Sequence, residues 1–145
     1  MTRVVSGQTI EVLDSTGRDP LAKPVRLLGI EAPNWSKQQP WSLAAKQRLE
    51  VLIQPDKTVL LEFDVESDRV TNDGAYLRLA YLWHDNQLLN EVLVEEGFVL
   101  ANSRSPNIKY EQRLSHAQEK ARLMGVGIWN PQNPMRQDPS EVDKH

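Results

Sequence analysis

The stretch RLLGIEAPN, residues 26–34, decides the fold and the site that this sequence leads us to expect. Its apolar run over 25–30 is typical of a strand, which Pro33 ends because proline donates no hydrogen bond to a ladder. Arg26 lies within this run and Glu31 follows it. Two interpretations of the pair stay open: side chains of a ligand site, or a strand-end salt bridge worth about 0–1 kcal/mol when exposed.

Working outward, the sequence predicts short strands and three helices. Strands are expected where β-branched and apolar residues gather, with a bent pair or a bulge around Gly7: 2–13, 25–30, 58–65, 76–83 and 98–101. Apolar spacings of three and four predict helices over 42–53, 88–96 and 109–124. If residues 2–13 hold a hairpin, this is the order of an OB-type barrel. We therefore expect an α+β fold, a five-stranded OB-type β-barrel with three helices.

The 145-residue chain has the composition of one globular domain, with 39% hydrophobic and 26% charged residues. We expect the domain to span 1–130 and the proline-rich residues 131–145 to form a flexible tail. The absence of cysteine excludes disulfide scaffolds, thiolate metal sites and cysteine nucleophiles. No apolar stretch reaches the roughly 18 residues of a membrane span, so we expect a soluble, cytoplasmic protein. The net charge of −3 disfavours nucleic acid as a partner.

Five landmarks, taken in order, resemble the staphylococcal-nuclease-like (thermonuclease) domain family. They are VSGQT at 5–9, RLLGIEAPN at 26–34, LAY at 79–81, LNEVLVEEG at 89–97 and GIW at 127–129. The resemblance covers most of the chain and implies the same OB-type fold. It also implies calcium-dependent phosphodiester hydrolysis, in which two carboxylates and a backbone carbonyl hold Ca²⁺, a glutamate acts on the attacking water, and two arginines stabilise the phosphate charge.

The chain departs from that pattern at the implied metal and base positions. The first ligand carboxylate falls at Gln8, the second at Glu31 and the backbone carbonyl at Ala32, so a bound cation would face one carboxylate fewer. The implied base falls at Asn34, whose amide takes up no proton near neutral pH. We therefore expect no cofactor, or calcium bound only weakly.

The two arginines of the pattern are only partly retained. Arg26 matches the first. Counting back from 79–81 places the second at Leu77, but the segment before it is longer than the family pattern, so Arg78 or Arg69 could reach the site instead. The tyrosines that pack on the nucleotide in the family fall at Ala75, Asn102 and Arg104. Base stacking, worth about 1–3 kcal/mol per base, is therefore largely lost. Arg104, at the last of these positions, is a candidate for ligand binding.

Two tryptophans, Trp35 and Trp41, bracket the polar segment before the first predicted helix. Tryptophan is enriched at interaction hot spots, so both are candidates to bind a partner. The alternative is that they pack at the helix entry and over the barrel mouth. Trp129 is expected in the core. The histidines share no metal-ligand spacing and are expected at the solvated surface: His84, His116 and His145.

Three functions remain open from the sequence. We favour a nuclease-fold domain that has lost phosphodiesterase activity and acts as a binding or assembly module for another protein or complex. The alternative is a weak or altered calcium-dependent nuclease that hydrolyses DNA or RNA. A third reading, which the acidic balance disfavours, is a domain that binds single strands without cleaving them, as many OB barrels do.

Overall fold

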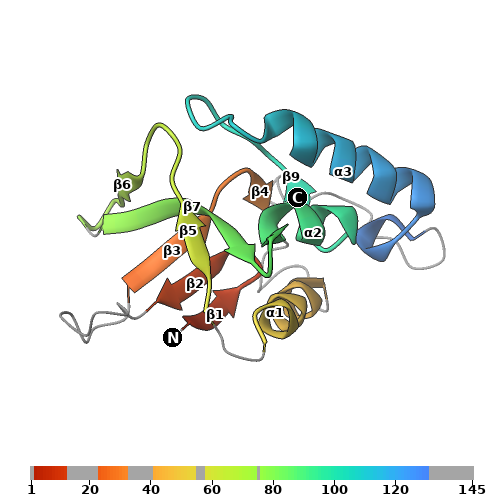
Figure 1. The fold of residues 1–145 in the computed structure, drawn as a ribbon, viewed down its shortest axis with the longest axis horizontal. Coiled ribbons are helices and arrows are strands. Elements are labelled where there is room, and N and C mark those ends of the chain that lie inside the picture. Colours follow the sequence, from red (N-terminus) through yellow and green to blue (C-terminus); the bar gives the residue numbers. More distant parts are fainter. Residues whose placement is uncertain (1, 13–22, 33–40, 55–57, 75, 131–145) are drawn as a thin grey trace.

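The computed structural model describes residues 2–12, 23–32, 41–54, 58–74 and 76–130, which form strands, helices and one 3₁₀ turn (Figure 1). In chain order these elements are β1 (Thr2–Ser6), β2 (Thr9–Val12), β3 (Lys23–Leu27), β4 (Ile30–Glu31), α1 (Trp41–Leu52), β5 (Leu60–Glu62), β6 (Asp68–Val70), β7 (Tyr76–His84), β8 (Gln87–Leu88), α2 (Leu89–Glu95), β9 (Leu100–Ala101), α3 (Glu111–Met124) and η1 (Gly127–Trp129). The predicted tail, 131–145, lies outside the described residues.

The strands form a curled, mixed sheet whose main path runs β1-β2-β3-β7-β5. Strands β3 and β7 pair in parallel, and the other pairs on this path are antiparallel. Strands β6 and β8 pair with β7, and β4 pairs with β9 in a separate small sheet. Together with the three α-helices, this arrangement confirms the predicted α+β, OB-type fold.

Three strand predictions need correction. The strand expected over 25–30 is interrupted by a turn at Leu28 and Gly29, which separates β3 from β4. The strand expected over 58–65 is limited to β5, because the Asp64 carboxylate accepts hydrogen bonds from the backbone N–H groups of Val65 and Lys109 and the chain leaves the ladder there. The strand expected over 98–101 contains only β9. The short strands β4, β6 and β8 were not predicted, since two or three residues are too few to show a period.

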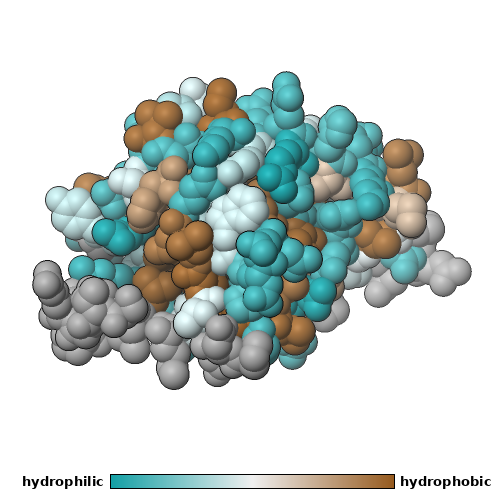
Figure 2. Space-filling view, in the orientation of Figure 1, coloured by the Kyte–Doolittle hydropathy of each residue, from teal (hydrophilic) through white to brown (hydrophobic). Residues whose placement is uncertain are grey.

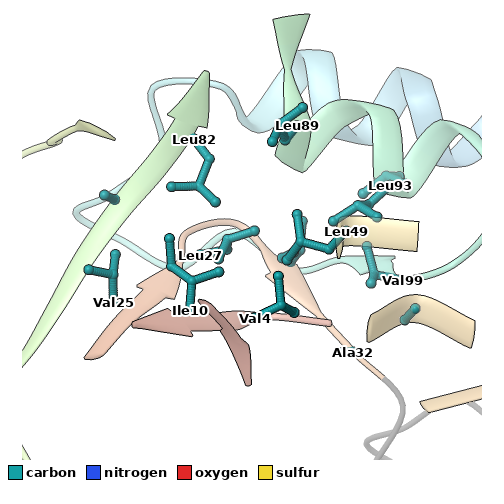
Figure 3. Close-up of a cluster of buried hydrophobic side chains, with 14 of the residues drawn as sticks. Val4, Ile10, Val25, Leu27, Ala32, Leu49, Leu82, Leu89, Leu93 and Val99 are labelled. Atoms are coloured by element: carbon teal, nitrogen blue, oxygen red, sulfur yellow. The ribbon is translucent and has the colours of Figure 1, made fainter. Parts of the chain in front are cut away.

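The main hydrophobic core lies between the sheet and the helices (Figure 3). Strands supply alternate residues to it because successive side chains point to opposite faces of a sheet. Helices α1 and α2 close the core with one apolar face each. The labelled members from the sheet and its ends are Val4, Ile10, Val25, Leu27, Ala32, Leu82 and Val99, and those from the helices are Leu49, Leu89 and Leu93.

The helices gather on one side of the sheet. Helix α1 packs against β1, while α2 packs against β7 and lies beside α3 (Figure 1). Figure 2 shows a largely hydrophilic surface over α2 and α3. None of the helices in the described ranges has the length and apolar character that crossing a bilayer requires.

The turn between β3 and β4 is held by one glycine and one buried amide. Gly29 has a φ of 76°, and a Cβ there would lie 2.4 Å from Cδ1 of Leu114, so only glycine fits. The Asn90 side chain is fully buried; its Nδ2 donates to the Leu28 carbonyl at 2.7 Å and its Oδ1 accepts from the Leu82 N–H at 2.9 Å. These contacts lock the turn against β7 and α2.

His84 is not a solvated surface residue, contrary to the expectation. Its side chain is only 8% exposed. Its ring nitrogens lie 2.8 Å from the Thr58 carbonyl oxygen and 3.0 Å from that of Gln54. The tertiary fold encloses this ring because β7 ends beside the end of α1. His116 on α3 is exposed, as expected.

Two carboxylates connect β5 and the following segment to β7 and α3. Glu62 accepts from Nε1 of Trp83 at 2.8 Å and from the Tyr110 hydroxyl at 2.7 Å, and it pairs with Lys109. Asp64 accepts from the Tyr81 hydroxyl at 2.8 Å. Burial by itself would raise the pKa of each carboxyl, but these hydrogen bonds outweigh it and lower both pKa values. The fold therefore stabilises the ionised forms.

Acid should therefore weaken the fold through Glu62 and Asp64. Their pKa values in the folded state lie below the ordinary 4.5 and 3.8, so the stability they supply is present above those values and is lost as pH falls through the folded-state pKa values. The free energy of unfolding, measured by urea titration, should decline below about pH 5. The variant Glu62→Gln should be less stable at neutral pH and should show a shallower decline.

Glu119→Gln is the matched control, because the Glu119 side chain is 62% exposed and its ion pair within the described ranges is a 3.4 Å contact with Arg122. In this variant the free energy of unfolding should decline with falling pH as it does in the unmodified protein. An identical pH dependence in Glu62→Gln and Glu119→Gln would contradict the stabilising role of the Glu62 cluster.

Candidate functional site

A cleft of about 280 Å³ opens between β3, β4, the β6 segment and the loop that follows β9. We call it the arginine cleft, because its lining includes arginines from three separate segments. It is lined by Gln8, Arg26, Leu27, Leu28, Gly29, Ile30, Glu31, Glu66, Arg69, Leu79, Asn102, Arg104, Ser105, Pro106 and Asn107. The sequence-predicted Gln8, Arg26, Glu31 and Arg104 thus come together in one place.

Arg26 reaches the cleft because of strand alternation. Its neighbours Val25 and Leu27 are fully buried in the core, so the Arg26 side chain leaves β3 on the opposite face. Its Nε is buried and has no hydrogen-bond partner among the described residues. Burial lowers the pKa of Arg26, and the positive charges of Arg69 and Arg104 lower it further. Arg69 and Arg104 therefore each lie close enough to repel the Arg26 guanidinium.

Arg69 enters the cleft from β6, directly across from the position where the sequence count placed the second arginine. Arg69 pairs with Leu77 in the β6–β7 register, and Arg26 pairs with Leu79 in the β3–β7 register. Directly opposed residues project on the same face of a sheet, so Arg69 and Arg26 approach the same hollow from either side of β7. Of the arginines that the sequence left open, Arg69 therefore lines the cleft, and strand pairing places it there.

Arg78 lies elsewhere. It is exposed, it pairs with Asp68 in the strand register, and its guanidinium carbon lies 5.4 Å from the centre of the Phe63 ring. It does not belong to the cleft lining. Because Leu79 lines the cleft, its neighbour Arg78 projects on the opposite face of the strand.

Arg104 is placed by a loop that Asn107 holds in position. The buried Asn107 side chain accepts from the Glu66 N–H at 2.8 Å and donates to the Glu66 carbonyl at 3.0 Å. The Asn107 N–H also donates to the Arg104 carbonyl at 2.9 Å. These bonds join the two walls of the cleft. Asn107 was not among the site residues predicted from the sequence. The sequence marks it only as a turn-forming residue that follows Pro106.

The cleft arginines are not neutralised by the protein itself. Arg26, Arg69 and Arg104 form no ion pair with any carboxylate in the parts of the chain that the structure describes. Glu31 instead accepts a hydrogen bond from Nδ2 of Asn102 at 3.2 Å. The predicted alternative of an Arg26–Glu31 salt bridge is therefore not observed, and the cleft keeps an excess of positive charge.

The donor groups do not fit the calcium site that the resemblance implies. The Gln8 side-chain oxygen accepts the Ala32 N–H at 2.7 Å, so it holds the chain after β4 and carries no charge to offer a cation. Glu31 is then the one implied ligand that is a carboxylate. The described ranges contain no cluster of three or more histidine, aspartate or glutamate side chains suited to a metal. Hard Ca²⁺ takes six to eight oxygen ligands in proteins.

Two of the remaining predicted site residues, Asn34 and Trp35, lie outside the described residues. Trp41 is the first residue of α1 and is half-buried. Trp129 is only partly buried rather than enclosed in the core, although its Nε1 is buried and has no partner among the described residues.

Comparison with known proteins identifies the family of this chain. Residues 24–131 match the family described as staphylococcal nuclease homologue. The chain belongs to this family. It is 32% identical to a thermonuclease of Staphylococcus hyicus over 133 residues, covering 88% of this chain and 73% of that protein.

Two further proteins are similar to this chain. A thermonuclease of Staphylococcus intermedius is 32% identical over 131 residues, with the same coverage of 88% and 73%. The uncharacterized protein MJ1439 of Methanocaldococcus jannaschii is 26% identical over 155 aligned positions, covering 92% of this chain and 72% of that protein. These matches confirm the family resemblance derived from the five sequence landmarks.

Calcium should bind weakly to this member of the staphylococcal nuclease family. With Gln8 neutral and bonded to Ala32, we expect a dissociation constant weaker than about 10⁻⁴ M in a calorimetric titration, the range of the weakest protein calcium sites. Gln8→Asp restores a carboxylate and should bind calcium more tightly than the unmodified protein. Micromolar calcium affinity in the unmodified protein would contradict this expectation.

Proposed function

We propose that this domain binds the phosphate groups of single-stranded nucleic acid in the arginine cleft and hydrolyses the strand little or not at all. The observation that supports it best is the convergence of Arg26, Arg69 and Arg104 on one hollow without carboxylate partners. The net charge of −3 disfavours a nucleic-acid ligand. Local charge decides phosphate binding, however, and here it is positive.

Guanidinium groups suit this ligand for geometric reasons. Each presents a planar fork of N–H donors that matches two phosphate oxygens, and it stays charged at neutral pH. Arg26 is partly desolvated and its Nε lacks an acceptor, which strengthens its attraction for an anion. A phosphate in the cleft would also relieve the repulsion that Arg69 and Arg104 exert on Arg26.

Hydrolysis requires groups that this chain replaces. The implied base position holds Asn34, and loss of a general base commonly costs 10²–10⁴-fold in rate. The implied first metal ligand is Gln8, whose side-chain oxygen is bonded to the Ala32 N–H. These two changes remove proton transfer and weaken metal binding together, while the arginines that would hold the phosphate remain.

A weak nuclease is the second candidate, and specific observations favour it as well. Two relatives carry the name thermonuclease, and Arg26 and Glu31 occupy the matching positions of the family pattern. A role in binding a protein partner through Trp35 and Trp41 stays a prediction, since the first lies outside the described residues and the second is half-buried.

Binding should depend on the cleft arginines. With a fluorescent single strand of about eight nucleotides in the presence of a chelator, Arg69→Ala should weaken binding about tenfold or more, because a charge-assisted hydrogen bond contributes about 1.5–3 kcal/mol. Arg78→Ala is the matched control; it removes the same charge from the paired strand, outside the cleft, and should change the affinity little. Fluorescence anisotropy measures both.

Salt and calcium separate the two candidate functions. Arg69→Ala should reduce the slope of log affinity against log salt by about 0.7, the value for one phosphate contact on a single strand, and Arg78→Ala should not. Equal losses of affinity in Arg69→Ala and Arg78→Ala would show that the strand is attracted by positive charge in general and is not bound in the cleft. Cleavage of the same strand that requires calcium and is abolished by Arg26→Ala, but not by Arg78→Ala, would establish the nuclease instead.

A further inference from the structure

A second hollow adjoins the arginine cleft on the side of α3. It has a volume of about 510 Å³ and shares Glu31, Asn102 and Arg104 with the cleft as a common wall. We call it the Trp129 groove, and it is lined by Glu31, Leu100, Ala101, Asn102, Arg104, Gln118, Arg122 and Trp129. A chain-like ligand bound in the cleft can therefore continue past Arg104 into the groove.

The groove extends the positive charge of the cleft. Arg122 is 55% exposed, and its described ion pair is a 3.4 Å contact with Glu119 one turn earlier on α3. Such exposed pairs contribute about 0–1 kcal/mol, so this contact competes weakly with a ligand anion. Glu31 is the one carboxylate of the lining, and Asn102 already donates to it.

The groove also carries a planar surface. The guanidinium carbon of Arg122 lies 5.4 Å from the centre of the Trp129 ring, so the two groups associate through a cation–π contact. Bases of single strands stack on aromatic rings and on arginine planes, typically with about 1–3 kcal/mol per base. At the positions of the family's stacking tyrosines this chain has no aromatic residue, which leaves Arg122 and Trp129 as the stacking surface next to the cleft.

We infer that the Trp129 groove binds the nucleotide adjacent to the phosphate held in the arginine cleft, with its base against Arg122 and Trp129 and its phosphate near Arg104. This inference rests on the proposed function, because the cleft supplies the neighbouring phosphate. It assigns a ligand of at least two nucleotides, and it gives α3 and η1 a role in recognition as well as in packing.

The test compares a short ligand with a long one in the presence of a chelator. Inorganic phosphate occupies the cleft alone, whereas a single strand of about eight nucleotides also reaches the groove. Arg122→Ala should weaken binding of the strand by about fivefold or more, the effect of losing one stacked base, and leave the affinity for phosphate within about twofold. Isothermal calorimetry gives both affinities.

Lys120→Ala is the matched control. Lys120 lies on the same helix, carries the same charge, pairs with Glu95 and is not part of the groove lining. Its removal should leave both affinities within about twofold, because a distant exposed charge is largely screened. Equal loss of strand affinity in Arg122→Ala and Lys120→Ala would overturn the inference.

Two further variants keep the test decisive. Arg122→Lys retains the charge without the plane and should lose part of the strand affinity; full retention would overturn the stacking contact. Trp129→Phe retains an aromatic ring in the groove. The melting temperatures of all variants are measured in parallel, so that a loss of affinity caused by unfolding is recognised. If the unmodified protein binds neither ligand, the proposed function fails and this inference with it. If Arg69→Ala weakens both ligands while Arg122→Ala weakens neither, the groove alone is wrong.

Discussion

The geometry of the site depends on the buried amide of Asn90. Its two hydrogen bonds satisfy the carbonyl of Leu28 and the N–H of Leu82, both of which are buried residues. An orphaned buried backbone group costs about 1–3 kcal/mol, so this one side chain holds the β3–β4 turn, β7 and α2 in a single arrangement. Gly29 makes the turn sterically possible. Arg26 before this turn and Glu31 after it are consequently presented at opposite ends of a rigid corner.

The distribution of unpaired charge depends on which charged side chains form ion pairs. Several carboxylates outside the cleft are paired with basic side chains: Glu11 with Arg3, Glu62 with Lys109, Glu91 with Arg113, Glu95 with Lys120 and Glu96 with Arg48. These pairs offset part of the negative charge of the chain. The three arginines of the cleft lack such partners among the described residues, and an anion is the ligand that this arrangement favours.

The chain keeps the fold of its family, while residues of the site differ from the family pattern. Where the resemblance implies a metal-binding carboxylate, the Gln8 side chain accepts the Ala32 N–H and so holds the chain after β4. Where the resemblance implies an arginine at Leu77 of β7, Arg69 lies directly opposite on β6 and lines the cleft. Asn107 joins the two walls of the cleft through its hydrogen bonds with Glu66.

The sequence by itself determined the family, the order of the main strands and helices, and the positions of Arg26, Glu31 and Gln8, because these depend on local periodicity and on motifs a few residues long. It left open whether Arg69 or Arg78 joins Arg26, and it missed the burial of His84, the role of Asn107 and the two-residue strands. Tertiary structure decided these points. Each depends on which segments far apart in the chain become neighbours in the sheet, and strand pairing and register are set by the packing of the whole core.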